Sequence, residues 1–297
     1  MIFEYGVKKR SCAAKHVYAQ QWLDLQSLSI GSPQYNTALQ AITDQFATAG
    51  ADPSKPNKSS LNQLRTNEIS LGVSPWELRE FQINAASHQL VNVTTKREPQ
   101  IPFNSQGQNP IASQVNAFGD FVNANMRKVI NDKMEIPATL NGVPFLGAKA
   151  HTLNPTTFHW DAAVTAGTGH IINDTARFHI SLNACSGCHG GETKTGNFTH
   201  VGLPSGGAAR LSPFLTGAPA FSSTPFLVPD PANRPSAANP ILWPFNDLER
   251  RGRDLRLFVL GRCGRFSFPR LVNQRVPIWL PIELTKELTF NPVTMDH

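Results

Sequence analysis

The chain has 297 residues, of which 40% are hydrophobic and 16% charged, with a formal net charge of +6 at pH 7. This length can bury a sizeable core in one or two domains, and 23 prolines with 21 glycines favour a loop-rich fold over a helical bundle. Because the sequence has no run of about 18 apolar residues and no Lys/Arg run with interleaved aromatic residues, we expect neither a membrane-spanning segment nor nucleic-acid binding.

The first half of the chain predicts helices followed by a hairpin. Ser32 is a capping hydroxyl before a proline, and apolar residues then recur at helical spacing up to Gly50. A later apolar stripe predicts the longest helix and makes Met126 a core residue rather than an iron ligand. In chain order we predict helices at 16–28 and 32–50, strands at 64–71, 76–83 and 89–94 with a turn at 84–88, and a helix at 111–129.

In the second half an irregular stretch leads to a central helix. Irregular segments often line a cofactor pocket, but we expect His151, His159 and His170 to be hydrogen-bonded surface residues. Asp174 is a candidate cap for a helix that ends at two cysteines. Further along we predict a proline-rich coil at 213–244, a helix at 245–260 and an extended tail from 266.

Cys185-Ser186-Gly187-Cys188-His189 carries the strongest chemical signal in the chain. The pattern CxxCH is the attachment signal of c-type haem, because two thiols three positions apart reach two vinyl groups of one porphyrin and the next His coordinates the iron. The same atoms allow two other interpretations. Cys185 and Cys188 can form a redox or structural disulfide, or the thiolates can bind zinc together with histidine.

The remaining ligands depend on the interpretation. With haem, His189 is the proximal ligand, and we expect His200 as the sixth ligand, with Met295 or a vacant position as alternatives. Two histidine ligands favour electron transfer, whereas a vacant position favours peroxide or oxygen chemistry. With zinc, Glu192 is the candidate general base of an ester or lactone hydrolase. The zinc ligands would then come from Cys185, Cys188, His189 and His200.

The other cysteines and the start of the chain bear on the compartment. Cys12 and Cys263 can close a disulfide, which suits an oxidising compartment, or remain buried free thiols. Residues 1–10 lack the apolar core of a signal peptide. Because haem c is attached outside the cytoplasm, we expect a mature or truncated form of a periplasmic or extracellular protein. If Met1 is the true start, the protein is cytoplasmic and its CxxCH serves another purpose.

Much of the positive charge comes from arginines near the carboxyl end. They can form a solvated basic face, or one or two of them can pair with haem propionates or dock an acidic partner, since guanidinium matches a carboxylate in bidentate geometry. These residues are Arg250, Arg251, Arg253, Arg256, Arg262, Arg265, Arg270 and Arg275.

The motif and its surroundings also carry a family resemblance. Residues 181–193, followed by Phe198-Thr199-His200-Val201, resemble a group of uncharacterised bacterial secreted proteins with a single CxxCH. Residues 67–69 with 75–81, and 245–248 with Arg250-Arg251, resemble other segments of that group. The resemblance implies an envelope protein similar to c-type cytochromes, and it does not supply an activity.

We therefore predict a loop-rich α+β fold of helices and β-hairpins, with a haem-bearing helix-loop region in the carboxy-terminal half. The expected division is a mixed helix and hairpin region at 1–150 and a CxxCH-bearing region at 151–297, within two domains or one. The predicted function is extracytoplasmic electron transfer or haem-based oxidoreduction by a monohaem protein, with a redox partner protein or a small-molecule substrate. The alternatives are a zinc hydrolase and a secreted structural or binding protein stapled by a Cys185–Cys188 disulfide.

Overall fold

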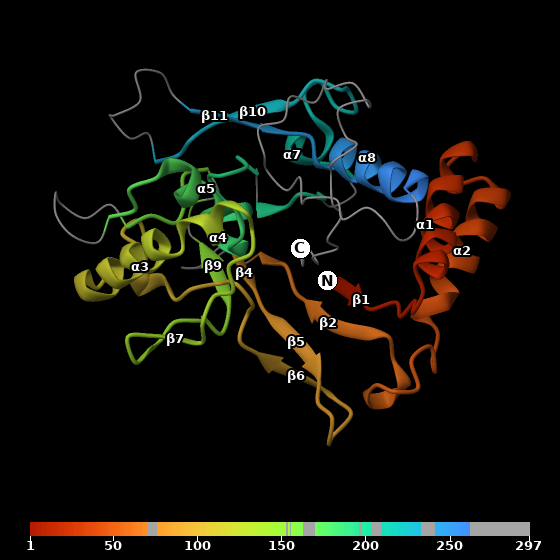
Figure 1. The fold of residues 1–297 in the computed structure, drawn as a ribbon, viewed down its shortest axis with the longest axis horizontal. Coiled ribbons are helices and arrows are strands. Elements are labelled where there is room, and N and C mark those ends of the chain that lie inside the picture. The colour runs from red at the N-terminus through yellow and green to blue at the C-terminus, as the bar shows by residue number, and fades with distance from the viewer. Residues whose placement is uncertain are drawn as a thin grey trace. The chain divides into compact units, whose positions relative to one another are not determined.

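The computed structural model has an α+β fold that combines helices with several small antiparallel sheets (Figure 1). It describes residues 1–69, 76–152, 154, 156–162, 170–195, 198–202, 209–232 and 241–261. Cys263, Met295, the predicted tail from 266 and four of the eight predicted arginines lie outside these residues. Within the described part, no helix is long and apolar enough to cross a membrane.

The chain divides into two compact units. Of the described residues, unit 1 holds 1–65, 81–92 and 250–261, and unit 2 holds those between 66 and 80 and between 93 and 249. The division predicted near residue 150 falls inside unit 2, so it does not coincide with either unit. The whole CxxCH motif belongs to unit 2.

Unit 1 combines a four-stranded sheet with helices. The strand order is β1-β2-β5-β6, so the predicted hairpin forms one edge of the sheet (Figure 1). The oxygen of Ser32 accepts a hydrogen bond from the Tyr35 amide, which confirms the predicted cap. The elements are β1 (Ile2–Tyr5), α1 (Cys12–Asp24), α2 (Pro33–Ala47), β2 (Leu61–Arg65), β5 (Glu80–Ile83), β6 (Leu90–Val93) and most of α8 (Asp247–Leu260).

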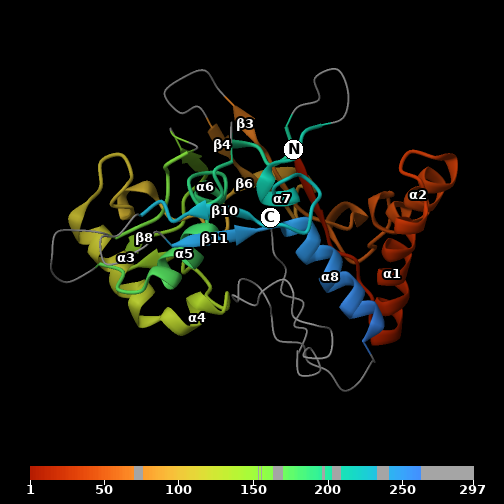
Figure 2. The ribbon, with the colours of Figure 1, turned by 90° about the horizontal axis from the view of Figure 1, so that it is seen from above.

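Unit 2 has its main core where α3 (Ala112–Ala124), α4 (Met126–Ile130) and α5 (Asp174–Leu182) come together (Figure 2). Met126 packs against this core as predicted. The predicted helix at 111–129 is broken at Asn125, which corrects the expectation of one continuous helix. The Asn125 side chain donates to the Phe121 carbonyl, and such local side-chain bonds compete with the helical backbone.

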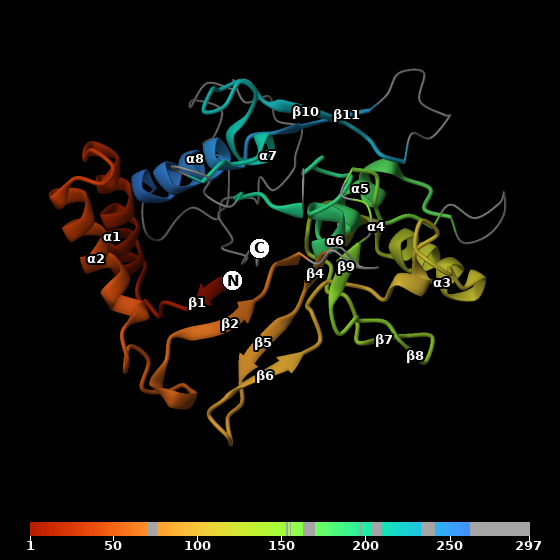
Figure 3. The same cartoon turned by 180° about the vertical axis from the view of Figure 1, so that it is seen from behind.

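Small sheets complete unit 2. The sheet β3-β4-β9 lies beside the short helix that carries the motif (Figure 3). The predicted coil at 213–244 is corrected, because it contains a helical turn and an antiparallel strand pair. The elements are β3 (Glu68–Ile69), β4 (Trp76–Leu78), β7 (Thr139–Leu140), β8 (Val143–Pro144), β9 (Ala150–Thr152), α6 (Cys185–Cys188), α7 (Pro213–Thr216), β10 (Phe226–Pro229) and β11 (Leu242–Phe245).

Candidate functional site

The motif cysteines begin a helix of their own instead of ending the preceding one. Asn173, rather than the predicted Asp174, caps α5 by accepting a hydrogen bond from the Ala176 amide. Helix α5 ends at Leu182, and α6 starts at Cys185 after a sharp change of direction. At this crossing a Cβ on Gly187 would collide with the Ser181 carbonyl. Close backbone approach therefore requires glycine in the middle of the motif.

Buried polar groups fix the backbone of α6. The Glu98 carboxylate accepts hydrogen bonds from the Ser186 amide, at 3.1 Å, and from the Ser186 hydroxyl. The indole of Trp160 donates to the same hydroxyl at 2.9 Å. Glu98, Trp160 and Ser186 are all buried, so each of these polar groups depends on the others for its hydrogen bonds. The variable positions of CxxCH are thus structural anchors.

Both motif cysteines are buried, and neither forms a disulfide. The structure therefore gives no support to the stapling disulfide between Cys185 and Cys188. Each thiol joins an apolar cluster. The cluster around Cys185 contains Trp76, Leu78, Ala150 and Phe198, and the cluster around Cys188 contains Phe178, Leu182, Val228, Trp243 and Phe245.

His189 is held on its face and on one edge. Its ring stacks on Trp76 with centroids 4.8 Å apart and an angle of 22° between planes. Its Nδ1 lies 2.7 Å from the Phe198 carbonyl oxygen, which makes Nδ1 the protonated donor. A neutral imidazole that donates through Nδ1 keeps Nε2 as an acceptor or metal ligand.

His200 lies next to the motif, as the sequence predicted for a ligand. Its Nε2 is 3.5 Å from Cys188 Sγ, and its ring centroid is 4.8 Å from that of His189. Its Nδ1 is 3.1 Å from the hydroxyl oxygens of both Thr195 and Ser212. The structure thus brings Cys188, His189 and His200 together. No group of three or more His, Cys, Asp or Glu in metal-binding geometry occurs among the described residues.

Glu192 belongs to a buried ionic cluster. Arg177, which has no exposed surface, donates to both Glu192 oxygens and to Asp230 at 2.9 Å. Burial disfavours the Arg177 charge, but the two carboxylates outweigh it and raise the pKa of the guanidinium. The Trp243 indole also donates to Asp230. Because Arg177 occupies both Glu192 oxygens, we assign no catalytic role to Glu192.

The other predicted histidines make contacts of their own. His159 is buried, with Nδ1 2.8 Å from the Thr157 carbonyl, which corrects the expectation of a surface residue, and His170 is exposed as expected. His151 lies on β9 opposite Glu77 on β4. Burial, and then the Lys149 charge, lower the pKa of His151. For Glu77, burial favours a higher pKa, but Lys149 and Arg79 outweigh it and lower the pKa.

Two further expectations concern unit 1. Cys12 is disulfide-bonded, while Cys263 lies outside the described residues. Of the predicted arginines, Arg250 and Arg253 both pair with Asp254, and Arg256 approaches Gln26. These contacts agree with a solvated, partly paired face of α8, and the role in binding propionates or an acidic partner stays a prediction.

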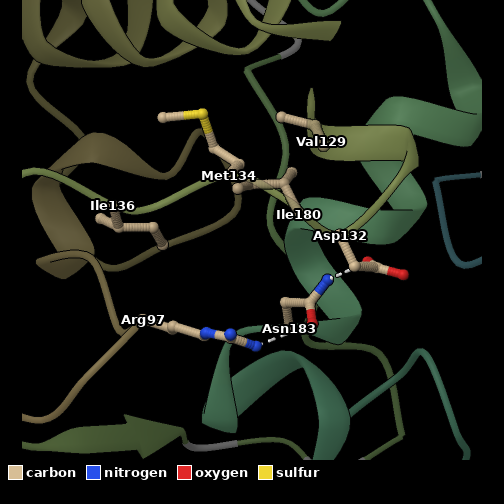
Figure 4. A pocket seen from close by; sticks show the side chains of 7 residues that line it. All are labelled: Arg97, Val129, Asp132, Met134, Ile136, Ile180 and Asn183. Carbon is tan, nitrogen blue, oxygen red and sulfur yellow. Dashed lines mark hydrogen bonds between the residues drawn. The ribbon is translucent and has the colours of Figure 1, made fainter. Parts of the chain in front are cut away.

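A small pocket lies beside the carboxyl end of α5 (Figure 4). Arg97 and Asn183 line its polar side, where the guanidinium is 3.5 Å from the Asn183 side-chain oxygen. Asn183 in turn donates to Asp132, which also lies 3.1 Å from Nδ1 of the buried His179. The pocket has room for about one water molecule, so it does not accommodate a cofactor.

Several residues that shape the site escaped sequence reasoning. Trp76 was expected in a strand and in a segment of the family resemblance but was given no role at the site, and Glu98, Arg177 and Ser212 carried no motif. Phe198 was noted only beside His200. Comparison with known proteins adds nothing to these observations, since no family model, curated protein or solved structure matches the chain.

Proposed function

We propose that the protein is an extracytoplasmic c-type cytochrome-like protein. In this proposal Cys185 and Cys188 bind one haem through thioether bonds, and His189 binds the iron. Bound haem supplies one-electron redox chemistry. The roles of the chain are to hold the haem, to orient the iron ligand and to exclude water.

The observation that carries the proposal is the hydrogen bond between His189 Nδ1 and the Phe198 carbonyl. Metal-binding histidines in proteins almost always donate their second ring N–H to a carbonyl, carboxylate or water, which fixes the tautomer and raises ligand basicity. His189 directly follows Cys188 in the chain, and because its Nδ1 donates to the carbonyl, Nε2 is the nitrogen that would bind the iron. This donor set fits haem c.

The surroundings of the thiols support the same proposal. Cys185 and Cys188 each lie in a cluster of aromatic and aliphatic side chains. A porphyrin is a large apolar ring, and burying such a surface is favourable at about 25 cal/mol per Å². The anchors on Ser186 hold the motif backbone while these side chains adjust to the ring.

His200 would supply a second ligand to the iron, which would favour electron transfer over substrate chemistry. The hydroxyls of Thr195 and Ser212 support this role, because either oxygen can accept a hydrogen bond from Nδ1, and that tautomer leaves Nε2 for the iron. Its Nε2 now faces the Cys188 sulfur, so that contact has to open when His200 binds iron.

The test is expression with an export signal in a host that attaches haem c, followed by purification. We expect a Soret band that survives denaturation and an intact mass increased by one haem. The Cys185→Ser, Cys188→Ser double variant should lose both signals, while Cys12→Ser, which removes a cysteine of unit 1, should keep them. Exported protein without iron and without thioether bonds would overturn the proposal.

One contact favours a second candidate, a zinc site. In tetrahedral zinc sites the Zn–S distance is about 2.3 Å and the Zn–N distance about 2.0 Å, which separates S and N ligands by about 3.5 Å. The distance between Cys188 Sγ and His200 Nε2 is 3.5 Å. Colourless protein with one zinc ion per chain, lost in Cys188→Ser and in His200→Ala, would establish this candidate. A hydrolase would then need a base other than Glu192.

A further inference from the structure

Trp76 is the largest side chain in contact with His189, and the fold holds it rigidly. It lies on β4, the central strand of the sheet β3-β4-β9, where it pairs with Ile69 on one side and Thr152 on the other. Its side chain has no exposed surface. Its indole N–H donates to the Asn67 side-chain oxygen at 2.5 Å. A buried indole with a satisfied N–H has little freedom to turn.

Phe198 completes the support from the other direction. Its ring stacks on the same indole at 5.9 Å and 10°, while its carbonyl accepts the hydrogen bond from His189 Nδ1. Trp76 thus touches both partners of that hydrogen bond, the imidazole through one contact and Phe198 through another.

The backbone of Phe198 is in an unfavourable conformation. Its φ is +57°, in the left-handed region that bulky side chains seldom adopt. Such a conformation persists only when surrounding contacts over-determine it, most often at functional sites. Two contacts hold the Phe198 backbone here: its ring stacks on Trp76, and its carbonyl accepts the hydrogen bond from His189.

We propose that Trp76 and Phe198 are positioning residues that fix the orientation and basicity of the His189 imidazole. The stack on Trp76 sets the plane of the ring, and the strained Phe198 backbone aims its carbonyl at Nδ1. This inference deepens the proposed function and rests on it, because the purpose of a fixed imidazole is to bind iron. A strong Nδ1 hydrogen bond makes His189 a better donor to the oxidised iron and lowers the reduction potential.

The test has one measurement on the apoprotein and one on the haem-loaded protein. In the apoprotein, NMR of ¹⁵N-histidine follows exchange of the His189 Nδ1 proton with solvent. In Trp76→Leu we expect exchange about tenfold faster, in line with the energy of an aromatic pair. In haem-loaded Trp76→Leu we expect the preference for oxidised iron to be tenfold weaker. For one electron, this change raises the reduction potential by about 59 mV.

Trp243→Leu is the matched control. Trp243 is also buried, also stacked on an aromatic ring and also hydrogen-bonded through its indole, but its partners are Phe178 and Asp230. It should lose stability without faster exchange of the His189 proton in the apoprotein. It is a control for that measurement alone, because Trp243 also belongs to the apolar cluster around Cys188. If Trp76→Leu does not fold, Trp76→Phe and Asn67→Ala are measured instead, with smaller accelerations expected.

Two results would separate the inference from the proposed function. Unchanged exchange in Trp76→Leu, or in the two milder variants if it does not fold, would overturn the positioning role even in a protein that carries haem. Faster exchange in the apoprotein of a chain that never acquires haem would establish the positioning role and reject the cytochrome.

Discussion

Two buried regions flank the CxxCH motif of unit 2, and they are built from opposite chemistry. On one side, Arg177, Glu192 and Asp230 form an ionic cluster closed to solvent. On the other, Trp76 and Phe198 form an aromatic wall against His189. The ionic cluster engages both Glu192 oxygens and both terminal nitrogens of Arg177, whereas the wall contacts His189 through the face of its ring and through Nδ1.

The comparison shows that one kind of contact fixes the backbone of the motif and another kind orients the imidazole that would bind the iron. Ionic pairs are directional and expensive to break, so they suit fixing the backbone after the motif, where Glu192 follows His189 by three positions. Aromatic contacts are non-polar and do not compete for a lone pair, so they suit the ligand itself. The predictions below alter the ionic cluster, the crossing of α5 and α6, the surroundings of His200 and the sheet that carries Trp76, in order of decreasing effect.

The largest loss of stability should come from Arg177→Met, which removes the positive charge of the ionic cluster. Removing one member of a buried ion pair leaves uncompensated charge and typically costs about 3–5 kcal/mol. Urea unfolding followed by fluorescence should show this loss. Arg210→Met, at an exposed arginine, should change the free energy of unfolding by less than about 0.5 kcal/mol. Equal effects of the two variants would show that the cluster is not a stability determinant.

Gly187→Ala should cause the next largest loss of stability, because it pushes α5 and α6 apart at the point where they cross. The added Cβ meets the Ser181 carbonyl, and overpacking of this kind costs about 1–3 kcal/mol. The control is Gly252→Ala in α8, where nothing lies within 4 Å of the new Cβ. That change should be neutral or stabilise by up to about 1 kcal/mol. A neutral Gly187→Ala would contradict the close approach.

Thr195→Val should have a smaller effect, confined to His200. The substitution removes the hydroxyl that contacts both Nδ1 of His200 and the hydroxyl of the buried Thr193. Loss of such hydrogen bonds costs about 0.5–1.5 kcal/mol. We expect the ¹⁵N shifts of His200 to move towards the other tautomer while those of His189 stay fixed. Ser212→Ala, which leaves Thr195 in place, serves as the milder companion, and a shift of both histidines would mean that the two are coupled.

The smallest effect concerns His151, on the sheet next to Trp76. Because its pKa in the folded state is lowered, the unfolded chain binds the proton at higher pH than the folded one. Its contribution to stability is therefore complete above the unfolded pKa of about 6.5 and is lost as pH falls through that value towards the folded pKa. His151→Gln should flatten the fall in stability in this window, measured by urea titrations at several pH values. An unchanged slope would assign the fall to other groups.

Local patterns predicted much of the secondary structure. The cap at Ser32, the hairpin around 84–88 and the helix of α8 follow from residues near one another in the chain, and the structure confirms them. The break at Asn125 and the strand pair β10–β11 were missed. The helix breaks at Asn125 because its side chain bonds to the preceding turn. The strands β10 and β11 pair within a stretch that its prolines led us to predict as coil.

The sequence by itself determined the chemistry available to this protein, because CxxCH and His200 are recognisable from residue type and spacing alone. Only the tertiary structure decided how these groups are held. The indole that stacks on His189 and the carboxylate that anchors Ser186 come from distant parts of the chain. The carbonyl that orients His189 and the arginine that occupies Glu192 lie nearer in sequence, but no motif singles them out. Long-range packing selects these partners, and the spacing of residues along the chain does not encode it.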